Sequence, residues 1–169
     1  MTEIDKRFVE FSKPFVNALK ETFKVMMQTE LSAHSPKVKQ SATTNGEITA
    51  TIGMNGKVTS NGEKKDFKGQ IGVSFPMDVY LKTASAMLME EYNEYNDEIA
   101  DTGGEIINIV MGNSKQSLFE MGYEIEMASP STIKGKDIEI KYPKGTTTIE
   151  ISIESQLGMF FLEICYLEV

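Results

Sequence analysis

The sequence has 169 residues, an apolar share of 40% and a formal net charge of −8. This apolar share is enough for a hydrophobic core, so disorder describes the chain poorly, and the length fits a single domain over 1–169. No stretch approaches the roughly 20 apolar residues of a membrane helix. The start, MTEIDKRFVEF, mixes acids and bases unlike a secretory signal, so we expect a soluble cytoplasmic protein that does not bind a membrane.

The residue types also exclude several common kinds of site. Nucleic-acid binding needs clustered Lys and Arg, so the acidic balance argues against it. A conventional zinc site or a Ser-His or Cys-His nucleophile would depend on the single histidine, His34, in the loop-like LSAHSPKV. The single cysteine, Cys165, rules out an internal disulfide and is expected to be an inert sheet residue. Five lysines of the first half are expected on a solvated face: Lys37, Lys39, Lys64, Lys65 and Lys68.

The first predicted element is a helix over 4–29. Pro14 lies inside it and predicts a kink or a broken start. Residues 36–75 then alternate apolar and polar, which predicts an antiparallel meander with one buried face. The apolar stripe of the first helix consists of Phe8, Phe11, Phe15, Leu19 and Phe23. The turns of the meander are predicted at Asn45-Gly46, Asn55-Gly56 and Asn61-Gly62.

A second helix is predicted from Pro76 to about Glu90, and an acidic connector, EEYNEYND, separates it from a third helix over 97–119. Asn96 or Asp97 is the natural N-cap of that third helix. A closing hairpin of TTTIEISIE and MFFLEICYL turns at 156–158. The predicted fold class is therefore α+β, an antiparallel sheet with a long C-terminal hairpin packed against helices. In the second helix we expect five residues to face inward: Val79, Leu81, Ala84, Met87 and Leu88.

The third helix carries the candidate site. A rotation of about 100° per residue gives it one wide apolar face and one polar face. Glu105 and Asn108, three positions apart on the polar side, stand about one turn above each other and can touch one partner together. The predicted inward residues are Ile99, Gly103, Ile106, Ile107, Val110 and Met111. The opposite face holds Glu98, Asp101, Glu105, Asn108, Ile109 and Gly112.

Three features favour a contact surface on this helix. Asn108 is a mediocre helix former in mid-helix, and each glycine there costs about 1 kcal/mol relative to Ala. Close approach of another backbone usually offsets such a cost, and Gly112 would leave room for a partner beside Asn108. Ile109 would add an apolar contact, and Asp101 completes the predicted partner-contact set. The alternative is a plain amphipathic helix, because a bare E-x-x-N is a weak signal that Glu90 and Asn93 also match.

The run GEIINIVMGN at 104–113, followed by SPSTIKGKDI at 129–138, resembles the CheX branch of the CheC/CheX/FliY chemotaxis phosphatases. The run GQIGVSFPMDVYLKTASAMLM at 69–89, the first helix and the closing hairpin are also similar, so the resemblance covers nearly the whole chain. The specific part is an E-x-x-N in a helix with G-N four residues later. The chain departs from the family pattern in the acidic stretch 90–96 and in the doublet Gly103-Gly104.

The resemblance implies a phosphatase that acts on the aspartyl phosphate of a CheY-type response regulator. Asn108 would orient the attacking water and Glu105 would pair with the regulator's lysine. The regulator would supply Mg²⁺, so this chain is expected to bind no metal or cofactor. A single such pair favours CheX over CheC, and CheX members pair as homodimers. The apolar final strand and an exposed side over 161–165 would support that pairing.

Two residues suffice for this chemistry because an aspartyl phosphate is already reactive and phosphoryl transfer depends mostly on positioning and electrostatics. The carboxamide of Asn108 offers an acceptor for water and a donor for a phosphoryl oxygen. Two other functions remain open at the level of sequence. One is a dimeric module that binds a regulator without hydrolysis, and the other is an oligomerisation domain that pairs through the long hairpin edge.

Overall fold

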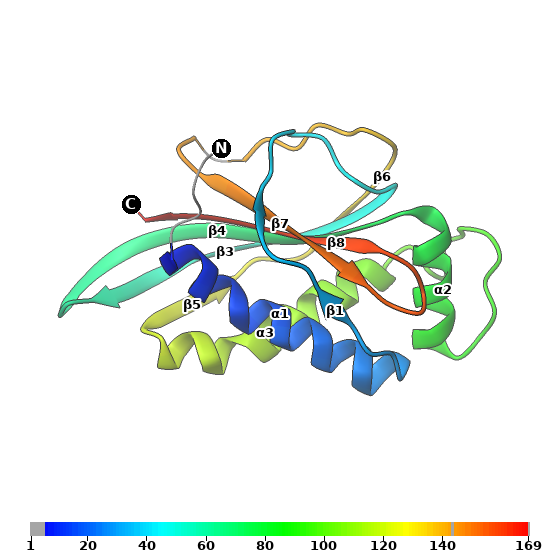
Figure 1. The fold of residues 1–169 in the computed structure, drawn as a ribbon, viewed down its shortest axis with the longest axis horizontal. Helices are drawn as coiled ribbons and strands as arrows, with labels where there is room; N and C mark the ends of the chain where they lie inside the picture. Colours follow the sequence, from blue (N-terminus) through cyan, green and yellow to red (C-terminus); the bar gives the residue numbers. More distant parts are fainter. Residues whose placement is uncertain (1–5, 143, 169) are drawn as a thin grey trace.

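The structure, a computed structural model, describes residues 6–142 and 144–168. One antiparallel sheet forms its centre, and two long helices, α1 and α3, lie beneath the same face of that sheet (Figure 1). The α+β class is therefore confirmed. The elements in chain order are α1 Lys6–Met27, β1 Ser32–Ala33, β2 Lys37–Val38, β3 Ile48–Ser60, β4 Glu63–Phe75, α2 Met77–Leu88, α3 Thr102–Glu120, β5 Tyr123–Met127, β6 Ser131–Lys134, β7 Thr147–Glu154 and β8 Phe160–Glu168.

Two long hairpins lie side by side in the sheet. β3 and β4 pair over 13 residues each, β7 pairs with β8, and β8 also pairs with β4. Short strands cover the outer sides of both hairpins, since β1 and β2 pair with β7 while β5 and β6 pair with β3. The edge of the closing hairpin is therefore already occupied. This arrangement contradicts the idea of an oligomerisation domain that pairs through that edge.

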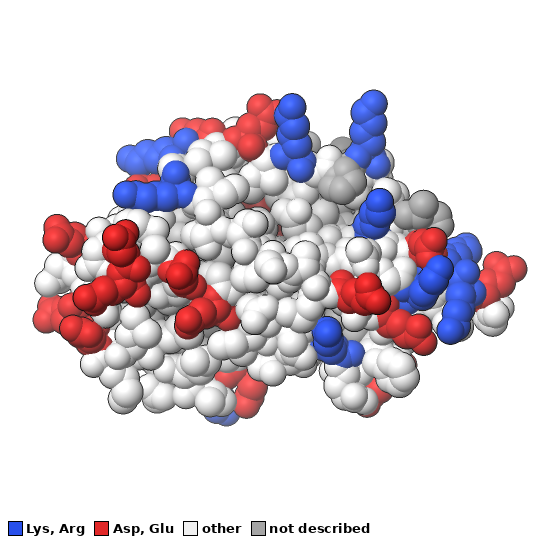
Figure 2. Space-filling view, turned by 180° about the vertical axis from the view of Figure 1, so that it is seen from behind, with Lys and Arg blue, Asp and Glu red and all other residues white. Residues whose placement is uncertain are grey.

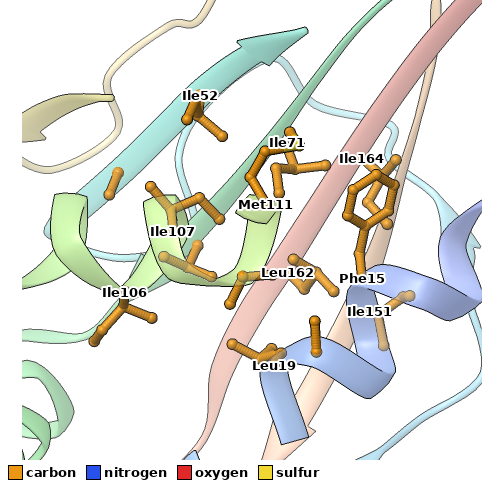
Figure 3. Packing of buried hydrophobic residues seen from close by; sticks show 14 of the residues in the cluster. Phe15, Leu19, Ile52, Ile71, Ile106, Ile107, Met111, Ile151, Leu162 and Ile164 are labelled. Carbon is orange, nitrogen blue, oxygen red and sulfur yellow. The ribbon is translucent and has the colours of Figure 1, made fainter. Parts of the chain in front are cut away.

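The core lies between the sheet and the two long helices. Figure 3 shows Phe15 and Leu19 of α1 and Met111 of α3 against isoleucines of the strands and Leu162 of β8. α1 continues through Pro14 without a break, and the predicted residues 4 and 5 lie outside the described part of the chain. Buried phenylalanines on both sides of Pro14 hold the helix on the sheet, which offsets the hydrogen bond that proline cannot donate.

Of the three predicted Asn-Gly turns, only Asn61-Gly62 joins two strands, with φ angles of 53° and 79°. Asn45-Gly46 lies in the segment before β3. Asn55-Gly56 lies inside β3, and Gly56 pairs with Phe67. A Cβ at Gly56 would stand 1.8 Å from the carbonyl oxygen of Glu124, so close approach of β5 requires this glycine.

Two segments, 39–47 and 138–142, cross over part of the sheet face opposite the helices and are joined to each other by backbone hydrogen bonds (Figure 1). Glu163 of β8 accepts hydrogen bonds there from Lys39 Nζ at 2.5 Å and from the Tyr142 hydroxyl at 3.0 Å. The Lys39 and Glu163 side chains are each only 3% exposed. The prediction that Lys39 lies on a solvated face is therefore wrong.

The side of β8 that was expected to be exposed at 161–165 is covered by these crossing segments. Glu163 and Cys165 are buried and Phe161 is half-buried. The sequence pattern alternates in the correct register, but it cannot show that distant segments fold over the second face. Within the described residues, no helix is long and apolar enough to cross a membrane.

Candidate functional site

The two faces of α3 differ sharply in burial. All six residues of the predicted inward face, from Ile99 to Met111, are buried, and the predicted division of the helix is confirmed on that side. On the other side Glu105 and Asn108 are exposed, and so are Asp101 and Gly112. Ile109 is half-buried, where the sequence predicted an exposed residue. Glu105 and Asn108 therefore project from a helix that the core holds in place.

Neither Glu105 nor Asn108 makes a side-chain hydrogen bond or ion pair within the described part of the chain. A carboxylate and a carboxamide that face water without partners remain available to an incoming group. Because the surrounding helix is anchored by fully buried isoleucines, these two groups need little rearrangement to meet a partner. The arrangement can hold a cation at Glu105 and orient a water molecule at Asn108.

α3 begins at Thr102, five residues later than predicted. Residues 97–101 form turns, and Asn96 accepts a hydrogen bond from the Glu98 backbone N–H at 2.9 Å instead of capping a helix. Asp101 occupies the cap position but makes no side-chain cap hydrogen bond. The first turn of α3 therefore depends on a group from elsewhere in the chain.

That group is the hydroxyl of Tyr80 in α2. The hydroxyl accepts a hydrogen bond from the Gly103 N–H at 3.1 Å and donates one to the Ile99 carbonyl oxygen at 2.5 Å. Burial raises the pKa of Tyr80, so this hydroxyl keeps its proton. Sequence reasoning missed Tyr80 because it expected Leu81, Met87 and Leu88 to face inward from α2.

In the structure Leu81 and Met87 are half-buried and Leu88 is 40% exposed, whereas Val79, Tyr80 and Ala84 are buried. α2 ends at Leu88 because Met89 adopts a left-handed conformation, with φ of 56°. The inward face of this helix is thus rotated toward Tyr80. A tyrosine within an otherwise aliphatic pattern was the signal available in the sequence.

The three glycines of α3 have different surroundings. A Cβ at Gly103 would lie 3.2 Å from the Ala50 Cβ, and one at Gly104 would lie 3.4 Å from Thr132 Oγ1. A Cβ at Gly112 would meet nothing within 4 Å. Gly103 and Gly104 thus permit contacts within the chain itself, while Gly112 leaves open space on the exposed face. The first residues of β6 and the loop that precedes them therefore lie beside the first turn of α3.

Acidic side chains gather near the start of α3. The stretch 83–114 contains no Lys, Arg or His, and Figure 2 shows acidic groups over the end of the molecule that holds α2 and the connector to α3. Among the described residues, no three His, Cys, Asp or Glu side chains form a group that could hold a metal ion. The acids of this stretch are Glu90, Glu91, Glu94, Asp97, Glu98, Asp101 and Glu105.

The candidate pair lies on the exposed face of α3 and points away from the core. A surface hollow of about 600 Å³ lies elsewhere, between β3, β4 and β5, and residues such as Asn55, Phe67 and Glu124 line it. A projecting pair suits a partner that brings its own concave site. Such geometry fits a macromolecular substrate better than a small molecule.

The antiparallel sheet with α1 and α3 on one face places the chain in the CheC-like class of α+β proteins. The family model Chemotaxis phosphatase CheX matches residues 48–154, which is more than half of the chain. The chain therefore belongs to the CheX chemotaxis phosphatase family. This membership confirms the predicted enzyme class, a phosphatase acting on a protein aspartyl phosphate.

Three relatives show the extent of the similarity. The CheY-P phosphatase CheX of Thermotoga maritima is 22% identical over 142 residues, which cover 83% of this chain and 86% of the relative. The chemotaxis protein CheX of Vibrio vulnificus is 32% identical, with a TM-score of 0.79 over 94% of this chain and 99% of the other. A CheX-CheY-BeF3-Mg+2 complex from Borrelia burgdorferi has 23% identity and a TM-score of 0.71, covering 92% and 96% of the two chains.

Proposed function

We propose that this protein hydrolyses the aspartyl phosphate of a CheY-type response regulator, with Asn108 orienting the attacking water and Glu105 pairing with the regulator's active-site lysine. The observation that carries the proposal is the exposure of both side chains, without partners among the described residues, on α3 of a CheX-family phosphatase. The Thermotoga maritima relative supports it, because that protein is named as a CheY-P phosphatase.

The chemistry needs little from this chain beyond geometry. A water molecule must be held in line with the phosphorus, and the Asn108 carbonyl can accept its proton while the amide N–H donates to a phosphoryl oxygen. Glu105, when ionised, forms a charge-assisted hydrogen bond with a lysine and thereby fixes the register of the docked helix. No strong base is required, because the aspartyl phosphate is itself reactive.

In this proposal Mg²⁺ belongs to the regulator's own phosphorylation site. The name of the Borrelia burgdorferi complex includes Mg²⁺ together with CheY and BeF3. By analogy, the regulator brings a metal-bound aspartyl phosphate to α3, and this chain contributes only protein groups. Removal of Mg²⁺ from the reaction would therefore act through the regulator and not through the fold of this protein.

Asp101, Ile109 and Gly112 would contact the regulator around the central pair. Asp101 lies one turn before Glu105, and its carbonyl accepts the Glu105 backbone N–H at 2.9 Å. Gly112 lies one turn after Asn108, with open space where a side chain would be. Ile109, half-buried, offers a small apolar area beside them. The five residues share one arc of the helix surface.

The test is phosphate release from a phosphorylated regulator with Mg²⁺, measured for Asn108→Ala and Glu105→Ala. Asn108→Ala should lose hydrolysis at least about 100-fold because no group orients the water, and it should still bind the regulator. Glu105→Ala should weaken both binding and hydrolysis. Binding is measured separately with beryllofluoride-loaded regulator, a stable mimic of the phosphorylated form.

Matched controls lie on the same helix. Gln116→Ala and Glu120→Ala remove an exposed amide and an exposed carboxylate from the second half of α3, outside the proposed contact. Both should release phosphate at the wild-type rate. Wild-type hydrolysis by Asn108→Ala would refute the catalytic assignment, and regulator binding without any phosphate release would favour a binding module instead.

We also propose that the protein forms a homodimer, which rests on the family resemblance alone because the side of β8 expected to contribute is buried. Sedimentation equilibrium at micromolar concentration should give twice the mass of one chain. A monomer at all concentrations would remove the dimer without affecting the assignment of Glu105 and Asn108.

A further inference from the structure

The start of α3 is capped by a side chain from another helix. The first backbone N–H groups of a helix have no partner inside the helix, and a side chain at the N-cap usually accepts one of them. At α3 the Asp101 side chain makes no such bond. The N–H of Gly103, which is buried as the second residue of the helix, instead donates to the Tyr80 hydroxyl from 23 residues away.

The same hydroxyl also binds the segment that leads into the helix. It donates to the Ile99 carbonyl oxygen at 2.5 Å, so one oxygen atom joins the last turn before α3 to its first turn. Tyr80 is fully buried, and its ring packs edge-on against Phe75 with 5.6 Å between centroids. The position of the hydroxyl is therefore set by α2 and the sheet, and not by α3 itself.

The glycine at position 103 makes this contact possible. A side chain there would meet Ala50 at 3.2 Å and the Tyr80 ring at 3.4 Å, so Gly103 brings the helix start close to both β3 and α2. The sequence flagged Gly103 as costly for a helix, and the contact with Tyr80 gives that glycine a function. The register of α3 along the sheet is thereby fixed at its first turn.

This register matters because Glu105 lies two residues after Gly103, and Asn108 lies five residues after Gly103. A helix rises about 1.5 Å and rotates about 100° per residue, so a shift of the first turn moves both side chains. Misplacement of a positioned catalytic group by about 1 Å can cost roughly 100-fold in rate. The first turn therefore sets where Glu105 and Asn108 meet a docked partner.

We propose that Tyr80 is a positioning residue for the candidate site, its hydroxyl capping α3 and fixing the height and rotation of Glu105 and Asn108. Tyr80 does not touch the regulator, since it is buried. The functional part of this inference rests on the proposed role of Glu105 and Asn108, whereas the capping part does not.

The test variant is Tyr80→Phe, which removes only the hydroxyl. Ser114→Ala is the matched control, because it also removes a buried hydroxyl from the α3 interface, one that bonds to the Val110 carbonyl oxygen at 2.6 Å far from the first turn. Both variants are compared with the wild-type protein in hydrogen exchange, urea unfolding and steady-state hydrolysis of phosphorylated regulator.

Tyr80→Phe should speed amide exchange at 99–105 and leave the second half of α3 protected as in the wild type. Its kcat should fall about tenfold or more, while Ser114→Ala, at comparable loss of stability, should keep kcat within about twofold. Because Tyr80 acts through Glu105, the effects of Tyr80→Phe and Glu105→Ala should be less than multiplicative in the double variant.

Wild-type kcat for Tyr80→Phe with a loosened first turn would overturn the positioning role, and unchanged exchange at 99–105 would overturn the cap itself. If Tyr80→Phe does not fold, the wild-type protein still tests the cap on which the positioning role depends: the Gly103 amide must exchange much more slowly than the Asp78 amide, which holds the same second position in α2, and equally fast exchange of the two would overturn the proposal. Full activity of Asn108→Ala would refute the proposed function and leave the exchange result standing.

Discussion

At the scale of single residues, the candidate site depends on side chains that have no partner among the described residues. Helical periodicity predicted that Glu105 and Asn108 lie on the exposed side of a helix with an apolar opposite face, whereas their proposed roles came from the family resemblance. Tyr80 could not be found in this way. Its role depends on a hydrogen bond to Gly103, 23 residues later, and no local pattern encodes such a contact.

Cys165 illustrates a residue whose reactivity the fold suppresses. It is fully buried in β8, and burial raises the pKa of its thiol to about 12. The nucleophilic form is the thiolate, so at pH 8 the thiol stays protonated and enclosed. We expect a disulfide reagent to label the native protein far more slowly than the urea-unfolded chain.

The measurement is the labelling rate as a function of pH and urea. In native buffer the rate should remain low from pH 7 to pH 9, since the thiol pKa lies above this window. In urea the rate should rise with pH as for an ordinary cysteine, whose pKa is about 8.5. Rapid stoichiometric labelling of the native protein at pH 8 would show that Cys165 is accessible and not inert.

At the scale of elements, substitutions of the α3 glycines should affect stability and regulator binding differently. Gly112 is exposed and has nothing within 4 Å of its missing side chain, so Gly112→Ala should raise the free energy of unfolding by up to about 1 kcal/mol. If this open space accommodates the regulator, the same variant should weaken regulator binding. Urea unfolding and binding of beryllofluoride-loaded regulator measure the two effects.

Gly103→Ala is the control for this pair of effects. Its added Cβ would lie 3.2 Å from the Ala50 Cβ and 3.4 Å from the Tyr80 ring, so the tight contact should cancel the gain in helix propensity or reverse it. An increase in stability together with unchanged regulator affinity in Gly112→Ala would remove Gly112 from the contact surface.

The elements themselves were largely predictable where a periodic pattern repeats along the chain. The predicted closing hairpin is present as β7 and β8, with Ile151 opposite Leu162 and Ile153 opposite Phe160. The start of α3 was wrong by five residues because acidic residues before it also suit a helix start. Gly56 was assigned to a turn because its real cause, the passing backbone of β5, comes from a distant part of the sequence.

At the scale of the whole molecule, a buried ion pair fastens the two crossing segments to the sheet. Lys39 and Glu163 are 124 residues apart, and Glu163 also accepts the hydrogen bond from Tyr142. Lys39→Met would leave this carboxylate buried without its cation, so we expect the free energy of unfolding to fall by about 3–5 kcal/mol. The loss is measured by urea unfolding.

Lys57→Met provides the comparison, because Lys57 pairs with Asp66 on the surface, where both side chains are more than half exposed. An exposed pair of this kind is worth about 0–1 kcal/mol. Similar small losses for both variants would show that the carboxylate at 163 does not need its lysine. The sequence could not predict the difference, since both lysines lie in polar, turn-rich stretches.

The last strand, β8, lies inside the sheet, with β7 on one side and β4 on the other. Ribosomes make a chain from its N-terminus, so β4 and both long helices emerge before the strand that joins the two hairpins exists. Until residues 160–168 are synthesised, β4 keeps one side unpaired and the apolar surface of α1 lacks part of its cover. The nascent protein must therefore remain incomplete, and open to chaperones, until nearly all of the described chain has left the ribosome.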